Sequence, residues 1–188
     1  VGVRHGGGAL GGTLYNCVIR GCWAEDDGGG AAGSLLYNCV IVGNTANDVG
    51  GQFSGGGARS CTLYNCTVYG NTATSNGAGV DKCVAYNSII WGNTLSDGTE
   101  ANTTTGDGAS TLYNCLTDAD PMFTDALNYD FTLQANSPAI DAGDSSIVTW
   151  VMDCAGNDRI MGSAVDIGAY EFDGSIAQTS DEAVFKVI

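Results

Sequence analysis

Short apolar runs recur along the chain, and each is interrupted by glycine, asparagine or aspartate. An amphipathic helix would place apolar residues at positions i, i+3, i+4 and i+7, a spacing that these runs lack. They hold β-branched and aromatic residues instead, in the segments CVIRGCW, CVIVGNT, CTVYGNT and SIIWGNT. This pattern predicts short strands separated by tight turns.

The runs belong to an internal repeat. The pentapeptide TLYNC occupies residues 13–17, 62–66 and 111–115, with the variants LLYNC at 35–39 and VAYNS at 84–88, so that its tyrosines are 22 or 27 residues apart. A glycine-rich cluster precedes each copy. A unit of about 22 residues with three short strands is one coil of a solenoid, in which equivalent strands stack about 4.8 Å apart. The repeat therefore predicts an all-β parallel solenoid of about five coils.

Columns of equivalent residues predict which side chains face inward. The column that contains Leu14 and Leu36 is apolar throughout and should point inward, whereas the column of Arg20 and Trp91 tolerates a charge and should point outward. Alternation then places the repeat cysteines inside and the repeat tyrosines outside. The asparagines lie at a bend, where stacked amides can bond from coil to coil. The predicted structural ladder consists of Asn16, Asn38, Asn65, Asn87 and Asn114, with Cys17, Cys39, Cys66 and Cys115.

The eight cysteines of this acidic, glycine-rich chain indicate a secreted or surface protein. A zinc site is not indicated, because no C-x-x-C motif occurs and His5 is the single histidine. Stacked cysteines have parallel Cβ vectors that hold their Cβ atoms about 4.8 Å apart, beyond the preferred disulfide distance of about 3.8 Å. Free, buried thiols are therefore favoured. A disulfide ladder remains the alternative, with Cys61 and Cys83 as its best pair.

The charge is strongly negative, with 21 acidic and 6 basic residues and a formal net charge of −15. Nucleic acid is not expected as a partner, because phosphate binding needs clustered Lys and Arg. Calcium is a possible ligand of the acidic segments at 25–30 and 96–108. An acidic protein kept soluble by its charge explains the same composition without a ligand. The candidate metal ligands are Asp26, Asp27, Asp97 and Asp107. Because no run of eighteen apolar residues occurs, the sequence predicts no membrane span.

The pattern L-x-N-C-x-I-x-G-N, with its glycine-rich leads, resembles the right-handed parallel β-helix repeat of bacterial surface proteins, including the polymorphic outer-membrane protein type. Residues 120–144 and 153–172 resemble the closing segment of secreted choice-of-anchor proteins, through DPMF at 120–123, SPAIDAG at 137–143 and VDIGAYE at 165–171. The resemblance covers residues 6–172. It implies a right-handed β-helix that is secreted or displayed on a bacterial surface. We expect coils at 1–117, a closing segment at 118–173, and a linker with a strand-like tail at 174–188.

Parallel β-helices include pectin-active enzymes, so the resemblance also admits a catalytic function. A lyase would need acidic calcium ligands beside an Arg or Lys base, and a hydrolase would need paired carboxylates. Arg20 and Arg59 belong to different strands, and acids are not expected near either of them in its own column. The sequence therefore favours a non-catalytic protein without deciding the question.

Two functions remain. The favoured one is a structural and adhesive module. Its apolar tail adds as a strand to the open first coil of another copy, which gives fibres. The alternatives are that the coils belong to a larger parent chain, or that the tail folds back on its own chain. The tail residues are Val184, Phe185, Val187 and Ile188. The rival is a polysaccharide-binding or polysaccharide-cleaving protein that uses exposed aromatic rings, although ring stacking between coils explains the same column. Its stacking candidates are Tyr15, Tyr37, Tyr64, Tyr86, Tyr113 and Trp91.

Overall fold

The computed structural model describes residues 4–48, 55–104 and 109–174. Two of the predicted sites, the metal ligand Asp107 and the tail that contains Val184, Phe185, Val187 and Ile188, lie outside these residues.

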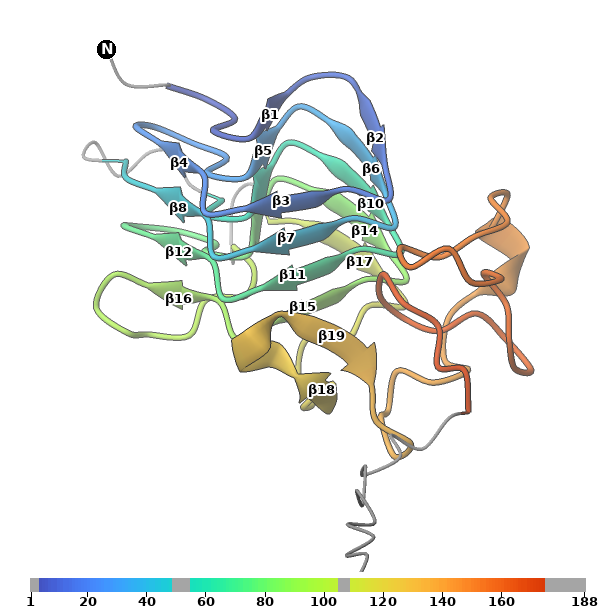
Figure 1. The fold of residues 1–188 in the computed structure, drawn as a ribbon. Coiled ribbons are helices and arrows are strands. Elements are labelled where there is room, and N and C mark those ends of the chain that lie inside the picture. Colours follow the sequence, from blue (N-terminus) through green and yellow to red (C-terminus); the bar gives the residue numbers. More distant parts are fainter. Residues whose placement is uncertain (1–3, 49–54, 105–108, 175–188) are drawn as a thin grey trace, which may run out of the picture.

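Stacked parallel sheets form the body of the protein, an all-β solenoid (Figure 1). The first sheet contains β1 (Ala9–Leu10), β5 (Ala31–Ala32), β9 (Ala58–Arg59) and β13 (Val80–Asp81). The second sheet contains β2 (Thr13–Tyr15), β6 (Leu35–Tyr37), β10 (Thr62–Tyr64), β14 (Val84–Tyr86) and β17 (Thr111–Tyr113). The third contains β3 (Val18–Arg20), β7 (Val40–Val42), β11 (Thr67–Tyr69) and β15 (Ile89–Trp91). The fourth contains β4 (Trp23–Ala24), β8 (Thr45–Ala46), β12 (Thr72–Ala73) and β16 (Thr94–Leu95).

Each coil therefore contributes up to four short strands, one more than the three expected from the sequence. The extra strand is only two residues long, a length that hydrophobic periodicity does not reveal. All pairings between the coils are parallel and in register, so that Leu63 faces Ala85 and Tyr64 faces Tyr86.

The inward columns are as predicted. Leu36, Leu63 and Ala85 are fully buried, and Ile41 and Val68 from the next sheet pack against them in one apolar cluster. Because residues at alternate positions of a strand face opposite sides, each coil contributes one apolar layer to this core. The ends of the column, Leu14 and Leu112, are only partly buried, since neither has a neighbouring coil on its outer side.

Corners between strands follow one local rule. A residue with positive φ, such as Asn65 (48°) or Gly70 (61°), turns the chain, and the next side chain donates to the carbonyl two residues before it. Cys66 Sγ thus donates to the Tyr64 carbonyl (3.4 Å), and Asn71 Nδ2 donates to the Tyr69 carbonyl (3.2 Å). Glycine and asparagine suit the turning position because both tolerate the left-handed region. The side chain is a second donor to these carbonyls, which already accept an N–H from the preceding coil, as Tyr64 O does from Asn38 N (3.0 Å).

The main amide ladder lies at a different corner from the predicted one. Asn44, Asn71, Asn93 and Asn102 form it, with Nδ2-to-Oδ1 distances of 2.9, 2.9 and 3.0 Å. The Oδ1 atoms also accept backbone N–H groups from the preceding coil, such as Asn44 N to Asn71 Oδ1 at 2.9 Å. Among the repeat asparagines of the predicted ladder, all of which lie within the described residues, one pair forms a coil-to-coil amide bond. Asn38 Nδ2 donates to Asn16 Oδ1 at 3.1 Å. Three of the four ladder residues, Asn44, Asn71 and Asn93, follow glycine in Gly-Asn-Thr segments, a signal present in the sequence, whereas Asn102 follows alanine.

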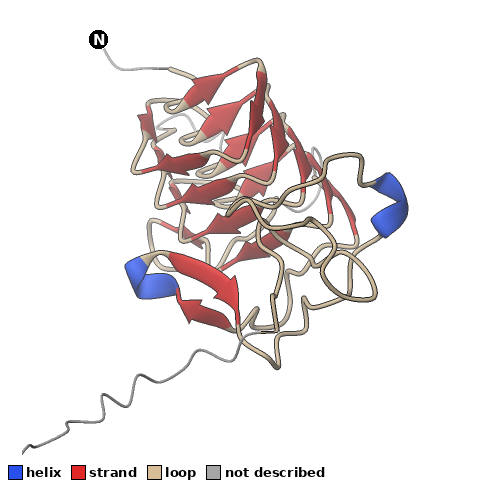
Figure 2. Cartoon of the chain, turned by 45° about the vertical axis from the view of Figure 1, so that its right-hand side comes forward, coloured by secondary structure: helices blue, strands red, loops and turns tan. Residues whose placement is uncertain are grey.

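The closing segment covers one side of the solenoid (Figure 2). It begins with an antiparallel hairpin of β18 (Phe123–Asp125) and β19 (Asp130–Leu133), joined by the 3-10 helix η1 (Ala126–Asn128), and a second 3-10 helix, η2 (Ser145–Ile147), follows. Phe123, Phe131 and Leu133 pack against the outward residues Val42 and Ile89 in a second apolar cluster. The third sheet is therefore largely buried on both faces at β7, β11 and β15, whereas the outward face of β3 stays exposed. No helix within the described residues is long and apolar enough to cross a membrane.

Replacing Asn71 by alanine should lower the free energy of unfolding by about 3 kcal/mol, because the Asn44 N–H and the Ile41 carbonyl would lose buried partners. Chemical denaturation monitored by circular dichroism measures this change. The control is Asn136→Ala, at an exposed position of the closing segment, which should stay within about 0.5 kcal/mol of the parent. Equal effects of the two substitutions would contradict the role of the ladder.

Candidate functional site

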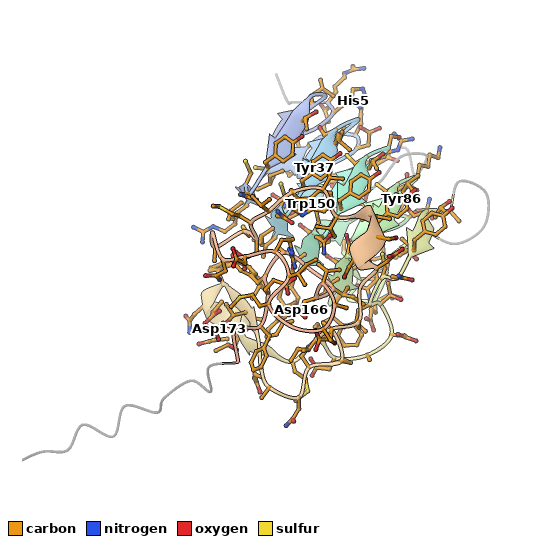
Figure 3. The ribbon with its side chains drawn as sticks, turned by 90° about the vertical axis from the view of Figure 1, so that its right-hand side faces the viewer. His5, Tyr37, Tyr86, Trp150, Asp166 and Asp173 are labelled. Carbon is orange, nitrogen blue, oxygen red and sulfur yellow. The ribbon has the colours of Figure 1, made fainter. Side chains whose placement is uncertain are left out.

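The repeat tyrosines form one continuous column on the outer face, as the sequence predicted. Their rings are nearly parallel, with centroids 4.8 to 4.9 Å apart, and the column consists of Tyr15, Tyr37, Tyr64, Tyr86 and Tyr113. Trp150 of the closing segment packs edge-on against Tyr37 (4.9 Å), beside which Figure 3 shows it, and against Tyr64 (5.7 Å). Only the end rings are largely open, with Tyr15 57% and Tyr113 50% exposed. The column is therefore not an uninterrupted platform for a ligand.

Trp91, the sixth stacking candidate, is also partly covered. It packs with Tyr69 in the cluster beneath the hairpin of the closing segment. Phe123 and Phe131 lie within 6 Å of the Tyr69 ring, at centroid distances of 5.7 and 5.3 Å. Trp91 and Tyr69 are each partly exposed and border an open hollow of about 320 Å³.

The repeat asparagines bind the closing segment. Asn38 Nδ2 donates to the Met152 carbonyl (2.7 Å), and Asn65 Nδ2 donates to the Asp166 carbonyl (3.0 Å). Asn87 donates to the Asp144 carbonyl (3.1 Å) and accepts the Asp144 N–H (2.9 Å). The outer copies, Asn16 and Asn114, are exposed. The interior repeat asparagines thus join the closing segment to the solenoid, a role that depends on contacts between distant residues and has no local sequence signal.

A buried ion pair completes this attachment. Arg159 and Glu171 come from the DRIMG and VDIGAYE segments, and Arg159 Nε donates to Glu171 Oε1 at 3.0 Å. The guanidinium also reaches Asn38 Oδ1 (3.1 Å) and the Gly168 carbonyl (3.2 Å). Burial raises the pKa of Glu171, and the nearby Arg159 charge partly offsets that rise. The pair has no room for a substrate, because both side chains are almost fully buried.

A second charged cluster involves one of the proposed calcium ligands. Arg59 bonds to Asp27 and, through Nε, to Asp81 Oδ2 at 3.0 Å. His5 Nδ1 lies 2.6 Å from Asp27 Oδ1, and Thr104 Oγ1 donates to Asp81 Oδ1 at 2.6 Å. The expectation that Arg59 has no acid nearby in its column was wrong, because Asp81 pairs with it in register. Alignment of GGGARSC with GAGVDKC reveals this pairing in the sequence.

The described candidate calcium ligands do not converge. Asp27 is buried in the Arg59 cluster, the Asp26 N–H donates to the Arg4 carbonyl (2.9 Å), and the exposed Asp97 accepts the Thr99 N–H (2.9 Å). Across residues 4–48, 55–104 and 109–174, no three His, Cys, Asp or Glu side chains are grouped closely enough to hold a metal ion.

All eight cysteines lie within the described residues and are free thiols. Cys39 and Cys66 of the predicted inner column are buried, whereas its end members Cys17 and Cys115 are partly exposed. Burial raises the pKa of Cys66 well above its usual value and raises that of Cys115 to about 11. A hydrogen bond from the neighbouring Cys66 thiol lowers the pKa of Cys39. The cysteines therefore serve as corner hydrogen-bonding groups as well as small apolar residues.

The second cysteine pair, Cys61 and Cys83, is also buried. The Cys61 N–H donates to Cys83 Sγ at 3.4 Å, and Cys61 Sγ accepts the Ser34 N–H at the same distance. The next side chain along this corner is Ser110, whose Oγ accepts the Cys83 N–H at 3.0 Å. Serine and cysteine are thus used at equivalent positions for the same hydrogen bond.

The N-terminal coil, formed by β1, β2, β3 and β4, presents the clearest unpartnered surface. Its exposed apolar residues are Leu10 (69%), Tyr15 (57%), Val18 (59%) and Trp23 (45%). Because β1, β2, β3 and β4 are all edge strands of their sheets, unpaired backbone groups accompany these side chains. Within the described residues, this coil therefore combines exposed strand edges with exposed large apolar side chains.

These features define the protein as an all-β parallel solenoid with a C-terminal segment packed along one side. The sequence matches no protein-family model, and comparisons with curated proteins and with solved structures also found no match.

Arg159→Met should lower the free energy of unfolding by about 4 kcal/mol, because it leaves the Glu171 carboxylate buried without its partner. The double variant Arg159→Met, Glu171→Leu should recover part of this loss, since the unpaired Glu171 charge is then removed, although the Asp166 N–H loses its acceptor (2.9 Å). Denaturant titration of both variants tests the ion pair. A double variant that is no more stable than the single one would contradict this account.

Pulsed alkylation at pH 8 should label the partly exposed Cys17, Cys22, Cys115 and Cys154 before the other cysteines. The buried Cys39, Cys61, Cys66 and Cys83 should react only when the coils open, because alkylation requires access as well as thiolate. Mass spectrometry of the labelled peptides gives the order. Early labelling of Cys66 in folded protein would be inconsistent with the described core.

Proposed function

We propose that this chain is a non-catalytic structural and adhesive module, secreted or displayed on a bacterial surface. It is a right-handed parallel β-helix of about five coils, and it assembles head to tail into fibres through its open N-terminal coil and its apolar C-terminal tail. The observation that carries the proposal is that exposed apolar side chains and unpaired strand edges coincide on the N-terminal coil.

Strand edges favour addition of another strand, because each edge has a row of free N–H and carbonyl groups. The tail sequence EAVFKVI at 182–188 supplies an apolar strand of suitable length. The partner is thus another copy of the chain. Coils of a larger parent chain would fill the same edge in the same geometry.

The contrast between the faces of the solenoid supports this role. The closing segment covers β7, β11 and β15 of the third sheet and the middle of the tyrosine column, and it is held there by Asn38, Asn65 and Asn87. Those surfaces therefore pack within the protein and stabilise its own fold. The N-terminal coil has no comparable cover among the described residues, so contact with other molecules is concentrated at the end of the solenoid.

Polysaccharide binding or cleavage is the second candidate. It is supported by an open groove of about 590 Å³ in the closing segment, lined by residues that include Thr132, Gln134, Asn157 and Tyr170. Such a mixture of polar and aromatic groups suits a sugar ring. Glycan-array binding, together with a reducing-end assay on acidic polysaccharides, tests it. Saturable binding or cleavage would favour this function over a purely structural one.

Negative-stain electron microscopy tests the main proposal. The full chain should form fibres as its concentration rises, and removal of residues 174–188 should abolish them. A matched variant that keeps the length of the tail but replaces Val184, Phe185, Val187 and Ile188 by serine should also remain dispersed. Dispersed particles of the full chain at every concentration, with or without calcium, would refute the proposal.

A further inference from the structure

The five-stranded sheet ends in two edge strands of identical sequence. Its order places β2 at one edge and β17 at the other, and both belong to copies of TLYNC, at 13–17 and 111–115. In each copy the threonine, tyrosine and asparagine are exposed and the leucine and cysteine are partly buried. The interior counterparts Leu36, Leu63 and Cys66 are fully buried. Both ends therefore expose the same side chains to a similar degree.

The interior strands show how two such edges pair. The first residue of each strand donates its N–H to the neighbouring strand of the preceding coil. The acceptor is the carbonyl of the residue just before that strand, as in Thr62 N to Ser34 O (3.0 Å). The asparagine after each strand donates its N–H to the tyrosine carbonyl of the next strand, as in Asn87 N to Tyr113 O (3.0 Å). These bonds repeat at every step from β2 to β17.

The same rule applied beyond β17 specifies two bonds to another molecule. The Thr13 N–H of a second copy would donate to the Ser110 carbonyl, and the Asn114 N–H would donate to the Tyr15 carbonyl of that copy. The Tyr15 ring of the second copy would then stack on Tyr113 and continue the column at its present spacing of about 4.8 Å. The pairing needs no new backbone conformation in either strand.

We propose that β17 of one copy pairs in parallel with β2 of a second copy, so that the tyrosine column runs through the junction. This inference rests on the proposed self-assembly: it assigns the β2 edge of the first coil to β17 and leaves β1, β3 and β4 as the edges to which the tail can add. The two edges lie at opposite ends of the sheet (Figure 1). The contact is therefore head to tail, and a head-to-tail contact that does not close into a ring produces a filament.

A charge swap at the junction tests the pairing. Thr13 and Thr111 occupy equivalent positions in the register and are both exposed, so they would face each other across each junction. Thr13→Asp with Thr111→Asp places like charges opposite each other, which is unfavourable between paired strands. Thr13→Lys with Thr111→Asp places opposite charges there instead. The second variant should associate about tenfold more tightly than the first.

Sedimentation velocity over a range of concentrations measures the association, and circular dichroism checks that each variant is folded. Ala135→Asp with Asn136→Asp is the matched control, because it adds the same two negative charges at exposed positions of the closing segment. The control and the Lys/Asp variant should associate like the parent chain, whereas the Asp/Asp variant should associate about tenfold more weakly. Equal association of the Asp/Asp and Lys/Asp variants would overturn the inference.

The outcomes separate this contact from the general proposal. If the Asp/Asp variant assembles like the parent but removal of residues 174–188 prevents assembly, self-assembly stands and the pairing of β17 with β2 fails. If the parent chain remains monomeric at all concentrations, both fail.

Discussion

The fold depends on hydrogen bonds at the corners of the solenoid. A coil with such short strands turns several times, and each turn would leave buried backbone groups without partners. At each corner a left-handed residue is followed by a side chain that bonds the carbonyl two residues earlier, as Cys66 and Asn71 do. The same side chain can also accept an N–H from the preceding coil, as Asn71 does from Asn44. One short side chain therefore reinforces the turn and accepts the N–H of the preceding coil, a role that cysteine, serine and asparagine share.

Attachment of the closing segment uses the same corners from the outside. The repeat asparagines turn the chain with positive φ, which directs their amides outward toward Met152, Asp144 and the Asp166 carbonyl. Arg159 adds a buried charge that reaches Asn38. The pentapeptide thus has three structural roles: its leucine fills the core, its tyrosine stacks between coils, and its asparagine binds the closing segment. No chemistry is needed to explain its repetition.

The sequence predicted the parallel solenoid, the inward columns and the stacked tyrosines, because each depends on a periodicity that is visible along the chain. It placed the main amide ladder at the wrong corner. Asn16 and Asn44 both sit at bends, and only the structure shows that the residue after the turn, rather than the turning residue, carries the ladder. Trp150 on the tyrosines and Glu171 beside Arg159 could not be predicted, since they depend on how a non-repetitive segment folds across distant coils. The Asp81 partner of Arg59 was available from alignment of the repeats.

Residue-resolved hydrogen exchange tests the central claim most directly. The claim is that corner side chains bond the backbone N–H groups of the interior coils, whereas backbone groups at the edge strands have no partner in a single molecule. The Asn71 amide donates to Asn93 Oδ1 (3.0 Å) inside the ladder, whereas Asn114 follows the edge strand β17. We expect the backbone N–H of Asn71 to be strongly protected from exchange at every protein concentration. The Asn114 amide should exchange rapidly in dilute solution and become protected as the concentration rises. Rapid exchange at Asn71, or full protection of Asn114 in the dilute monomer, would contradict the account.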